Sequence, residues 1–426
     1  RRRRHSSLVG YKLNAVRLPF SGAQKIAWVQ PKGERHERCA APSGPNQHFD
    51  VVLAMTADAQ YEAPAMYLRG IGTATPAWRY RKDECLAEFE QSEWFGKLNA
   101  RARFIANTVL RRDNGIDERH LAVESLQDVF TIDPDTLSRR FGEHAPALAA
   151  DAARRALDAA GLAPSDIDAV VVSTCTGYLC PGLSGYVVER LGLRRDVQAF
   201  DLVGQGCAAA LPNLQFGRSL IGSGASQNVL SVCVEVSSAA MFLDNDPGVL
   251  ISACLFGDGA GAAVLSATPG DCASAAFPDA RRRSIEWRDS ASYIEPAHRD
   301  ALRFEQSGGM LRNILTRQVP GLAAEQAEQA LRLVLARSGL SQNDIGAWIM
   351  HAGGRDVLQA VERRFGLQAD DLLYSADVLR RYGNLSSAFV YFVLDAALAD
   401  EAPGDWWWLS AFGAGFSCHG ALLRVQ

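Results

Sequence analysis

The sequence lacks the cysteine spacings that mark a disulfide scaffold or a zinc site. Its nine cysteines are scattered over 426 residues, and none of them forms a CxxC pair. In a chain of this length, such scattered cysteines indicate free thiols in a reducing compartment. We therefore expect a cytoplasmic protein that has no structural metal and no disulfide framework.

Long apolar runs and a strong charge of one sign are also absent. No apolar run approaches the roughly 18–20 residues that a membrane span needs. The net charge of −4 gives no reason to expect a nucleic acid or an anionic membrane as a partner. The composition, 48% hydrophobic and 22% charged, is typical of a soluble globular protein with a sizeable core.

Residues 1–65 lack the periodic patterns of the rest of the chain. They begin with four arginines and continue with polar, Pro- and Gly-containing sequence. A secretory signal would need about 7–15 apolar residues after the basic start, and no such stretch follows. We expect a poorly ordered extension here, although the four arginines are also compatible with an anion-binding patch.

From residue 66 onward, apolar runs alternate with helical patterns, which indicates an α/β architecture. A helical pattern over 147–162 ends at Gly161, and the apolar, β-branched run at 167–175 is typical of a central buried strand. The stretch ALDAAGLAPSDIDAVVVSTCTG returns later as VLARSGLSQNDIGAWIMHAGG, in which Gly339 takes the place of Gly161.

A second match follows in the same order. LFGDGAGAAVL at 255–265 is echoed by SAFGAGFSCHGALL at 410–423. Two ordered matches predict a duplicated α/β unit. We place its halves at 66–280 and 281–426.

Three side chains that could take part in catalysis lie at corresponding strand or helix ends in the two halves. Cys207 opens a helix after the turn DLVGQG, a position that favours the thiolate. His351 ends an apolar strand, where α/β folds keep their sites, and Asn384 lies in a Gly-Asn turn before a helix. The alternatives are an inert buried thiol, a hydrogen-bonded core histidine and an ordinary helix cap. Pro212 is expected to kink the helix that follows Cys207.

Five stretches together, GQGCAAAL, LFGDGAGAAVL, IMHAGGRDVLQAVE, YGNLSSAFVYFVLD and AFGAGF, resemble the type III polyketide synthases, the chalcone and stilbene synthase family. The resemblance covers residues 66–426. It is closest to the bacterial alkylresorcinol and alkylpyrone branch, through GIGTATP, DNGIDERHLA and DPGVLISACLFGDGAG. It implies a thiolase-like fold, in which the duplicated α/β unit gives five layers (αβαβα), and a homodimer.

The resemblance also implies a mechanism. Cys207 takes an acyl group from an acyl-CoA starter, and His351 and Asn384 donate hydrogen bonds to the enolate that malonyl-CoA forms as it loses CO2. His351 is expected to lower the pKa of the thiol as well. CoA thioesters are the substrates, and no cofactor or metal is required. Small side chains along the pocket favour a medium- or long-chain fatty acyl starter, which ends as an alkylresorcinol or alkylpyrone.

Further site residues are carried over from the resemblance. Met241 or Phe242 is expected to replace the family's first gatekeeping phenylalanine. Arg111, Arg112 and Arg355 are candidates for contacts with the phosphates of CoA, although exposed arginines are usually solvated surface. The remaining residues expected on the substrate pocket are Cys175, Thr176, Cys180, Ser237, Gly353, Gly354, Gly413 and Gly415.

Three other functions share parts of this pattern. An initiating ketoacyl synthase, which uses malonyl-acyl carrier protein, has the same fold and triad, but that family carries a glutamine after the histidine, where this chain has Ala352. A papain-like hydrolase keeps its cysteine near the mature N-terminus, unlike Cys207. A non-catalytic acyl-CoA-binding relative often loses the cysteine or the histidine, and here all three residues are present.

Overall fold

A ten-stranded mixed sheet runs through residues 65–426, the part of the chain that the computed structural model describes. The extension expected at 1–65 lies outside the described residues, apart from Ala65. The first half contributes the strands β1 (Met66–Ala74), β4 (Ala169–Ser173), β5 (Gln198–Leu202), β6 (Asn228–Glu235), β7 (Gly259–Ser266) and β8 (Asp271–Ser274). The second half contributes β9 (Arg283–Ile294), β12 (Ile345–Met350), β13 (Trp406–Gly413) and β14 (Ser417–Val425).

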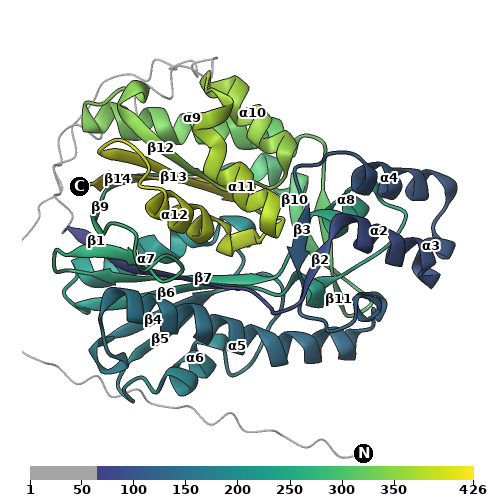
Figure 1. The fold of residues 1–426 in the computed structure, drawn as a ribbon, viewed down its shortest axis with the longest axis horizontal. Helices are drawn as coiled ribbons and strands as arrows, with labels where there is room; N and C mark the ends of the chain where they lie inside the picture. Colours follow the sequence, from purple (N-terminus) through teal and green to yellow (C-terminus); the bar gives the residue numbers. More distant parts are fainter. Residues whose placement is uncertain (1–64) are drawn as a thin grey trace, which may run out of the picture. The chain divides into compact units, whose positions relative to one another are not determined.

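The strand order is β12-β13-β14-β9-β8-β1-β7-β6-β4-β5, with a further antiparallel pairing of β1 with β9. That pairing joins the two halves, and Figure 1 shows their strands as two layers. Helices lie outside both layers and between them, which confirms the expected αβαβα arrangement. The outer helices on one side are α5 (Pro134–Ala160) and α6 (Leu183–Leu191). On the other side lies α9 (Val319–Ser338), and α10 (Arg355–Phe365) packs on it. The central helices are α7 (Ala210–Gly222) and α12 (Phe389–Ala399).

The duplication seen in the sequence appears as repeated local structure. α5 ends at Gly161 and α9 ends at Gly339, and both glycines adopt a left-handed conformation (φ 65° and 67°). A 3-10 turn and then a buried strand follow in each case. In these turns Asp166 accepts a backbone N–H at 2.8 Å and Asp344 accepts one at 2.7 Å. The matched residues therefore perform the same structural task in both halves.

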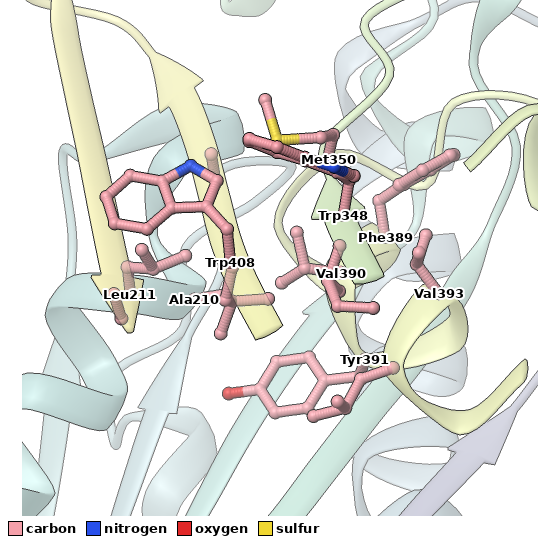
Figure 2. Packing of buried hydrophobic residues seen from close by; sticks show 14 of the residues in the cluster. Ala210, Leu211, Trp348, Met350, Phe389, Val390, Tyr391, Val393 and Trp408 are labelled. Atoms are coloured by element: carbon pink, nitrogen blue, oxygen red, sulfur yellow. The ribbon is translucent and has the colours of Figure 1, made fainter. Parts of the chain in front are cut away.

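The central helices are buried between the two sheet layers. α12 is apolar on most of its surface, apart from the buried Asp395, as expected for a helix that contacts strands on both sides. Figure 2 shows Phe389, Val390, Tyr391 and Val393 of α12 packed near Trp348, Met350 and Trp408 of the second sheet layer and Ala210 and Leu211 of α7.

One polar network crosses this core. The Tyr391 hydroxyl lies 2.8 Å from Ser231 Oγ, and Ser231 donates to the Asn213 side chain at 2.7 Å. Buried polar groups stabilise a core only when they are paired, as these are. The network links β6 to both central helices, and so helps to fix the point where those helices begin.

None of the helices in residues 65–426 combines the length and apolarity that a membrane crossing requires.

The remaining elements gather at one end of the sheet layers, on the right in Figure 1. These elements are β2 (Arg79–Arg81), α2 (Lys82–Gln91), α3 (Glu93–Lys97), α4 (Ala100–Arg111), β3 (Glu118–His120), α8 (Pro247–Leu255), β10 (Leu302–Ser307) and β11 (Met310–Leu315). Behind them, α11 (Leu373–Tyr382) leads to the turn that carries Asn384.

Candidate active site

Cys207 lies in a 3-10 turn, Gly206–Ala208, that leads directly into the central helix α7. Gly206 has φ +57°, a conformation that glycine adopts without strain. Gly413 of β13 packs so closely on this turn that a Cβ there would lie 2.6 Å from the Gln205 carbonyl oxygen and 2.6 Å from the Ala208 nitrogen. The two glycines therefore let the second half approach the backbone around the thiol.

The expected kink at Pro212 is wrong. α7 begins at Ala210 and continues to Gly222, so the proline occupies the third position of the first turn. Backbone amides in the first turn have no partner within the helix, and a proline there removes no hydrogen bond.

His351 follows β12 and is 1% exposed. Its ring packs edge-on against Phe389 and Phe412, with centroid distances of 5.3 and 4.9 Å. Neither ring nitrogen has a hydrogen-bond partner in the described structure. Both ring nitrogens are therefore free to form hydrogen bonds with a bound molecule.

Asn384 is positioned by its neighbours. Its Nδ2 donates to the Gly353 carbonyl at 3.2 Å, and its Oδ1 accepts the Ser386 amide at 2.8 Å. The Ser386 hydroxyl in turn donates to the sulfur of Cys207 at 3.2 Å. A continuous chain of contacts thus links the cysteine, the asparagine and the loop that follows His351.

All three predicted catalytic side chains border one cavity of about 760 Å³, called here the main cavity. The structure therefore brings Cys207, His351 and Asn384 together, although they are far apart in the chain. Gly353 and Gly354 border the same cavity, as predicted, and so does Phe412.

A buried glutamate behind the thiol was missed by the sequence analysis. Glu235 ends β6, is fully buried, and accepts hydrogen bonds from the Cys175 amide (3.1 Å), the Thr176 hydroxyl (2.9 Å), the Ser386 hydroxyl (3.3 Å) and the Ser387 hydroxyl. Burial raises the pKa of this carboxyl. The sequence signal that could have pointed to Glu235 is a single carboxylate at the end of the apolar strand LSVCVE.

The electrostatics of the thiol differ from the sequence-based prediction. Burial raises the pKa of Cys207 to about 12; the hydrogen bond from Ser386 opposes this rise and the charge of Glu235 adds to it. Burial also lowers the pKa of His351 to about 3. The expected low thiol pKa is therefore wrong for the free enzyme, because desolvation outweighs the helix terminus. Burial therefore favours the uncharged form of both groups in the free enzyme.

Replacing Glu235 with glutamine is expected to lower the pKa of Cys207, because a negative charge near the thiolate is removed. The pH dependence of Cys207 alkylation by iodoacetamide measures this shift, which should bring rapid alkylation to lower pH. Glu325→Gln, an exposed change on α9, is the control. An unchanged alkylation profile would contradict the negative charge assigned to Glu235.

Two small hollows lie beside the main cavity, since Phe256 and Asn313 border both the main cavity and the first of them. The inner hollow, about 30 Å³, is bordered by the predicted pocket residues Cys175, Thr176, Ser237, Met241 and Phe242. The outer hollow, about 40 Å³, lies next to it, since Leu121, Met241 and Ala253 border both. Phe256, which the sequence analysis did not single out, borders both the main cavity and the inner hollow.

The structure does not bring every predicted residue to these spaces. Cys180 is exposed, and neither Cys180 nor Gly415 borders the main cavity or the hollows. Gly413 acts through close packing rather than through a cavity wall. Arg111 pairs with Glu90 at 2.6 Å on the outer side of α4.

The predicted arginines Arg112 and Arg355 do border the main cavity, and Arg355 pairs with Asp113 at 3.2 Å. Arg101 and Arg317 border it as well and were missed, because nothing in their local sequence sets them apart from surface arginines. Within residues 65–426, no group of three or more His, Cys, Asp and Glu side chains is arranged to hold a metal ion.

Comparison with protein families assigns the chain to a family. The model described as FAE1/Type III polyketide synthase-like protein matches residues 73–337, and that of the chalcone and stilbene synthases, C-terminal domain, matches residues 295–426. The chain therefore belongs to the type III polyketide synthase family. Members are acyltransferase-type condensing enzymes that use CoA thioesters and need no further cofactor.

Among curated proteins, the chain is 33% identical over 322 residues to 1,3,6,8-tetrahydroxynaphthalene synthase of Streptomyces peucetius subsp. caesius (74% of this chain, 82% of that protein). It is 29% identical over 395 residues to the alpha-pyrone synthesis polyketide synthase-like Pks18 of Mycobacterium tuberculosis (90% and 97%). Among solved structures, PKS-I from the brown alga Ectocarpus siliculosus has a TM-score of 0.75 at 24% identity, covering 86% of this chain and 100% of that one. The structural likeness confirms the thiolase-like fold.

Proposed function

We propose that this enzyme loads a medium- or long-chain fatty acyl group from acyl-CoA onto Cys207, extends it with malonyl-CoA, and closes the product to an alkylresorcinol or alkylpyrone. The observation that carries the proposal of a fatty starter is the pair of mostly apolar hollows beside the main cavity. The relative named for alpha-pyrone synthesis is consistent with the lactone outcome.

The loading step follows from two neutral side chains. The sulfur of Cys207 attacks the thioester carbonyl while a ring nitrogen of His351 accepts the thiol proton. The carbon–sulfur bond to CoA then breaks, and the departing CoA sulfur takes that proton from the imidazolium. Because burial disfavours a thiolate–imidazolium pair before attack, the proton moves to His351 as the new carbon–sulfur bond forms.

Chain extension uses the same cavity. Malonyl-CoA loses CO2, and the electron pair of the broken bond forms an enolate whose oxygen accepts hydrogen bonds from His351 and Asn384. The enolate carbon attacks the acyl-Cys207 carbonyl, and the Cys207 sulfur leaves as a thiolate. The lengthened chain, now a 3-ketoacyl-CoA, returns to Cys207 when this thiolate attacks its thioester carbonyl and CoA leaves. Each donor stabilises the developing oxyanion by about 3–4 kcal/mol in a site that excludes water.

We assign the phosphates of CoA to Arg101, Arg112 and Arg317 at the cavity wall, none of which is in an ion pair within residues 65–426.

Met241, together with Leu121 and Ala253, borders both the inner hollow and the outer one. Two hollows of about 30 and 40 Å³ hold only a few methylene groups as they stand. Methionine is flexible and readily changes rotamer, so a shift of Met241 would join them into one channel for an acyl chain. Starter length is therefore assigned to this side chain.

Replacing Met241 with tryptophan is expected to block the channel and to lower the ratio of palmitoyl-CoA to butyryl-CoA turnover by about tenfold or more. Met241→Ala should raise that ratio, because it opens the wall between the hollows. Competition between the two starters, with products identified by mass spectrometry, measures the ratio. Met241→Leu keeps the volume and is the matched control. A ratio that is the same in all four proteins would contradict the fatty-acyl channel.

We also propose a homodimer. β5 lies at the edge of the ten-stranded sheet, and an exposed strand edge readily pairs with another chain. Tyr178 and Val203, two large exposed apolar side chains, border a cavity of about 500 Å³ on the side of Cys175 and Thr176 away from the main cavity. A second copy would cover this apolar surface.

A further inference from the structure

Arg119 is a buried arginine without a carboxylate partner. It lies in β3 with 6% of its surface exposed, and it takes part in none of the ion pairs within residues 65–426. Its Nη1 instead donates to the backbone carbonyls of Ala253 at 3.0 Å and Phe256 at 3.1 Å. Burying a guanidinium is costly, and these charge-assisted bonds, together with the more distant charge of Asp258, favour its charged form.

The two carbonyls lie at the C-terminal end of α8. The last carbonyls of a helix have no partner within the helix and carry its partial negative charge. In a longer helix the Ala253 carbonyl would accept the Gly257 amide, but that amide donates to the Asn384 carbonyl at 3.0 Å. Arg119 supplies both the donor and the positive charge that this helix end lacks.

The same turn holds the backbone of Asn384. The Asn384 amide donates to the Leu255 carbonyl at 2.9 Å, and its carbonyl accepts the Gly257 amide, so that Phe256 and Asn384 form a parallel bridge. Because Arg119 holds Phe256 between these two bonds, a displacement of the turn would move Asn384 with it.

The stem of Arg119 also supports the residue before Asn384. Gly383 has φ +71°, and a Cβ there would lie 3.0 Å from Arg119 Cγ and 2.8 Å from the Leu255 carbonyl oxygen. Only glycine combines that conformation with so little space. β3 is itself anchored, since the Asp258 amide donates to the His120 carbonyl at 2.8 Å.

We propose that Arg119 is a positioning residue for Asn384, an inference that rests on the proposed function, in which the Asn384 carboxamide donates to the enolate from malonyl-CoA. Arg119 holds the end of α8, and the end of α8 holds the backbone of Asn384. With that backbone fixed, Nδ2 gives one N–H to the Gly353 carbonyl and keeps the other for the main cavity. A shift of even about 1 Å would misdirect this donor.

The test compares two half-reactions in Arg119→Met and Arg119→Lys. CO2 release from malonyl-CoA without a starter requires Asn384, whereas acylation of Cys207 by an acyl-CoA, followed by intact-protein mass spectrometry, does not. Arg119→Met should lower CO2 release by about 10- to 100-fold and leave acylation within about threefold. Arg119→Lys should recover part of the loss, because an ammonium keeps the charge but not the planar fork. Arg79→Met, an exposed change on the neighbouring strand β2, should alter neither.

A double-mutant cycle decides whether Arg119 acts through Asn384. Asn384→Ala should lower CO2 release, and adding Arg119→Met should lower it little further. The positioning role would be overturned if the double mutant lost CO2 release by the product of the two single losses, or if Arg119→Met lost acylation and CO2 release equally. Either result would leave the proposed function standing. Unchanged CO2 release in Asn384→Ala would instead overturn the proposed function, and this inference with it. If Arg119→Met does not fold, Arg119→Lys in both backgrounds makes the same comparison.

Discussion

Replacing Cys207 with alanine is expected to abolish polyketide formation, with a loss of at least about 10⁴-fold, while CO2 release from malonyl-CoA continues. The thiol forms the acyl-enzyme bond, and no neighbouring group can replace it as the covalent carrier. Decarboxylation depends instead on the hydrogen bonds that His351 and Asn384 donate, and both residues remain in place. Product analysis with an acyl-CoA starter, alongside CO2 release without one, measures the two activities separately.

Cys175→Ala is the matched control for this experiment. Cys175 is also close to Glu235 and Ser386, but it borders the inner hollow rather than the main cavity. The variant should still form the acyl-enzyme at Cys207. Retention of polyketide formation in Cys207→Ala would contradict the assignment of the nucleophile.

Asn384→Ala is expected to show the opposite pattern, with CO2 release lowered by about 10²- to 10³-fold and Cys207 acylation largely kept. The carboxamide is a preorganised donor, held by Gly353 and Ser386, and its removal leaves the enolate oxygen with one donor fewer. His351→Ala should lower both activities, because the imidazole is assigned to proton transfer in loading and to hydrogen bonding in decarboxylation. If Asn384→Ala lowered Cys207 acylation as much as His351→Ala does, this division of roles would be contradicted.

The pH dependence of CO2 release provides an independent check on His351. Burial lowers its pKa to about 3, so the ring stays neutral from about pH 4 upward. The rate of CO2 release in the free enzyme should therefore show no ionisation near pH 6.5, where an exposed histidine titrates. A titration there that disappears in His351→Ala would show that the ring is more solvated than the structure indicates.

The sequence predicts those parts of the fold and site that depend on short local patterns. Gly161 and Gly339 end helices in the left-handed conformation, which a helix terminus signals within a few residues. Cys207, His351 and Asn384 lie at strand or helix ends, and the duplicated pattern puts these ends in corresponding places. Local signals and the repeat therefore pointed to an α/β duplication and to the three side chains as candidates, whereas the five layers and the catalytic roles came from the family resemblance.

The other features depend on contacts between distant segments. Glu235 and Ser386 meet behind the thiol through strands and turns that are 151 positions apart, and neither residue type is unusual in its own segment. The pKa of Cys207 was misjudged because desolvation depends on everything packed around the sulfur, whereas the helix terminus is visible in the sequence. Arg119 looks like any arginine on a short strand until the end of α8 is placed beside it.

The most direct test of the account is mass spectrometry of the peptide that contains Cys207, after brief mixing of the enzyme with a fatty acyl-CoA and malonyl-CoA. The account predicts the starter acyl group on Cys207, followed by the same group lengthened by two-carbon ketide units, and neither species in Cys207→Ala. An acyl group found only on another cysteine, or a starter on Cys207 that is never lengthened while CO2 is released, would contradict it.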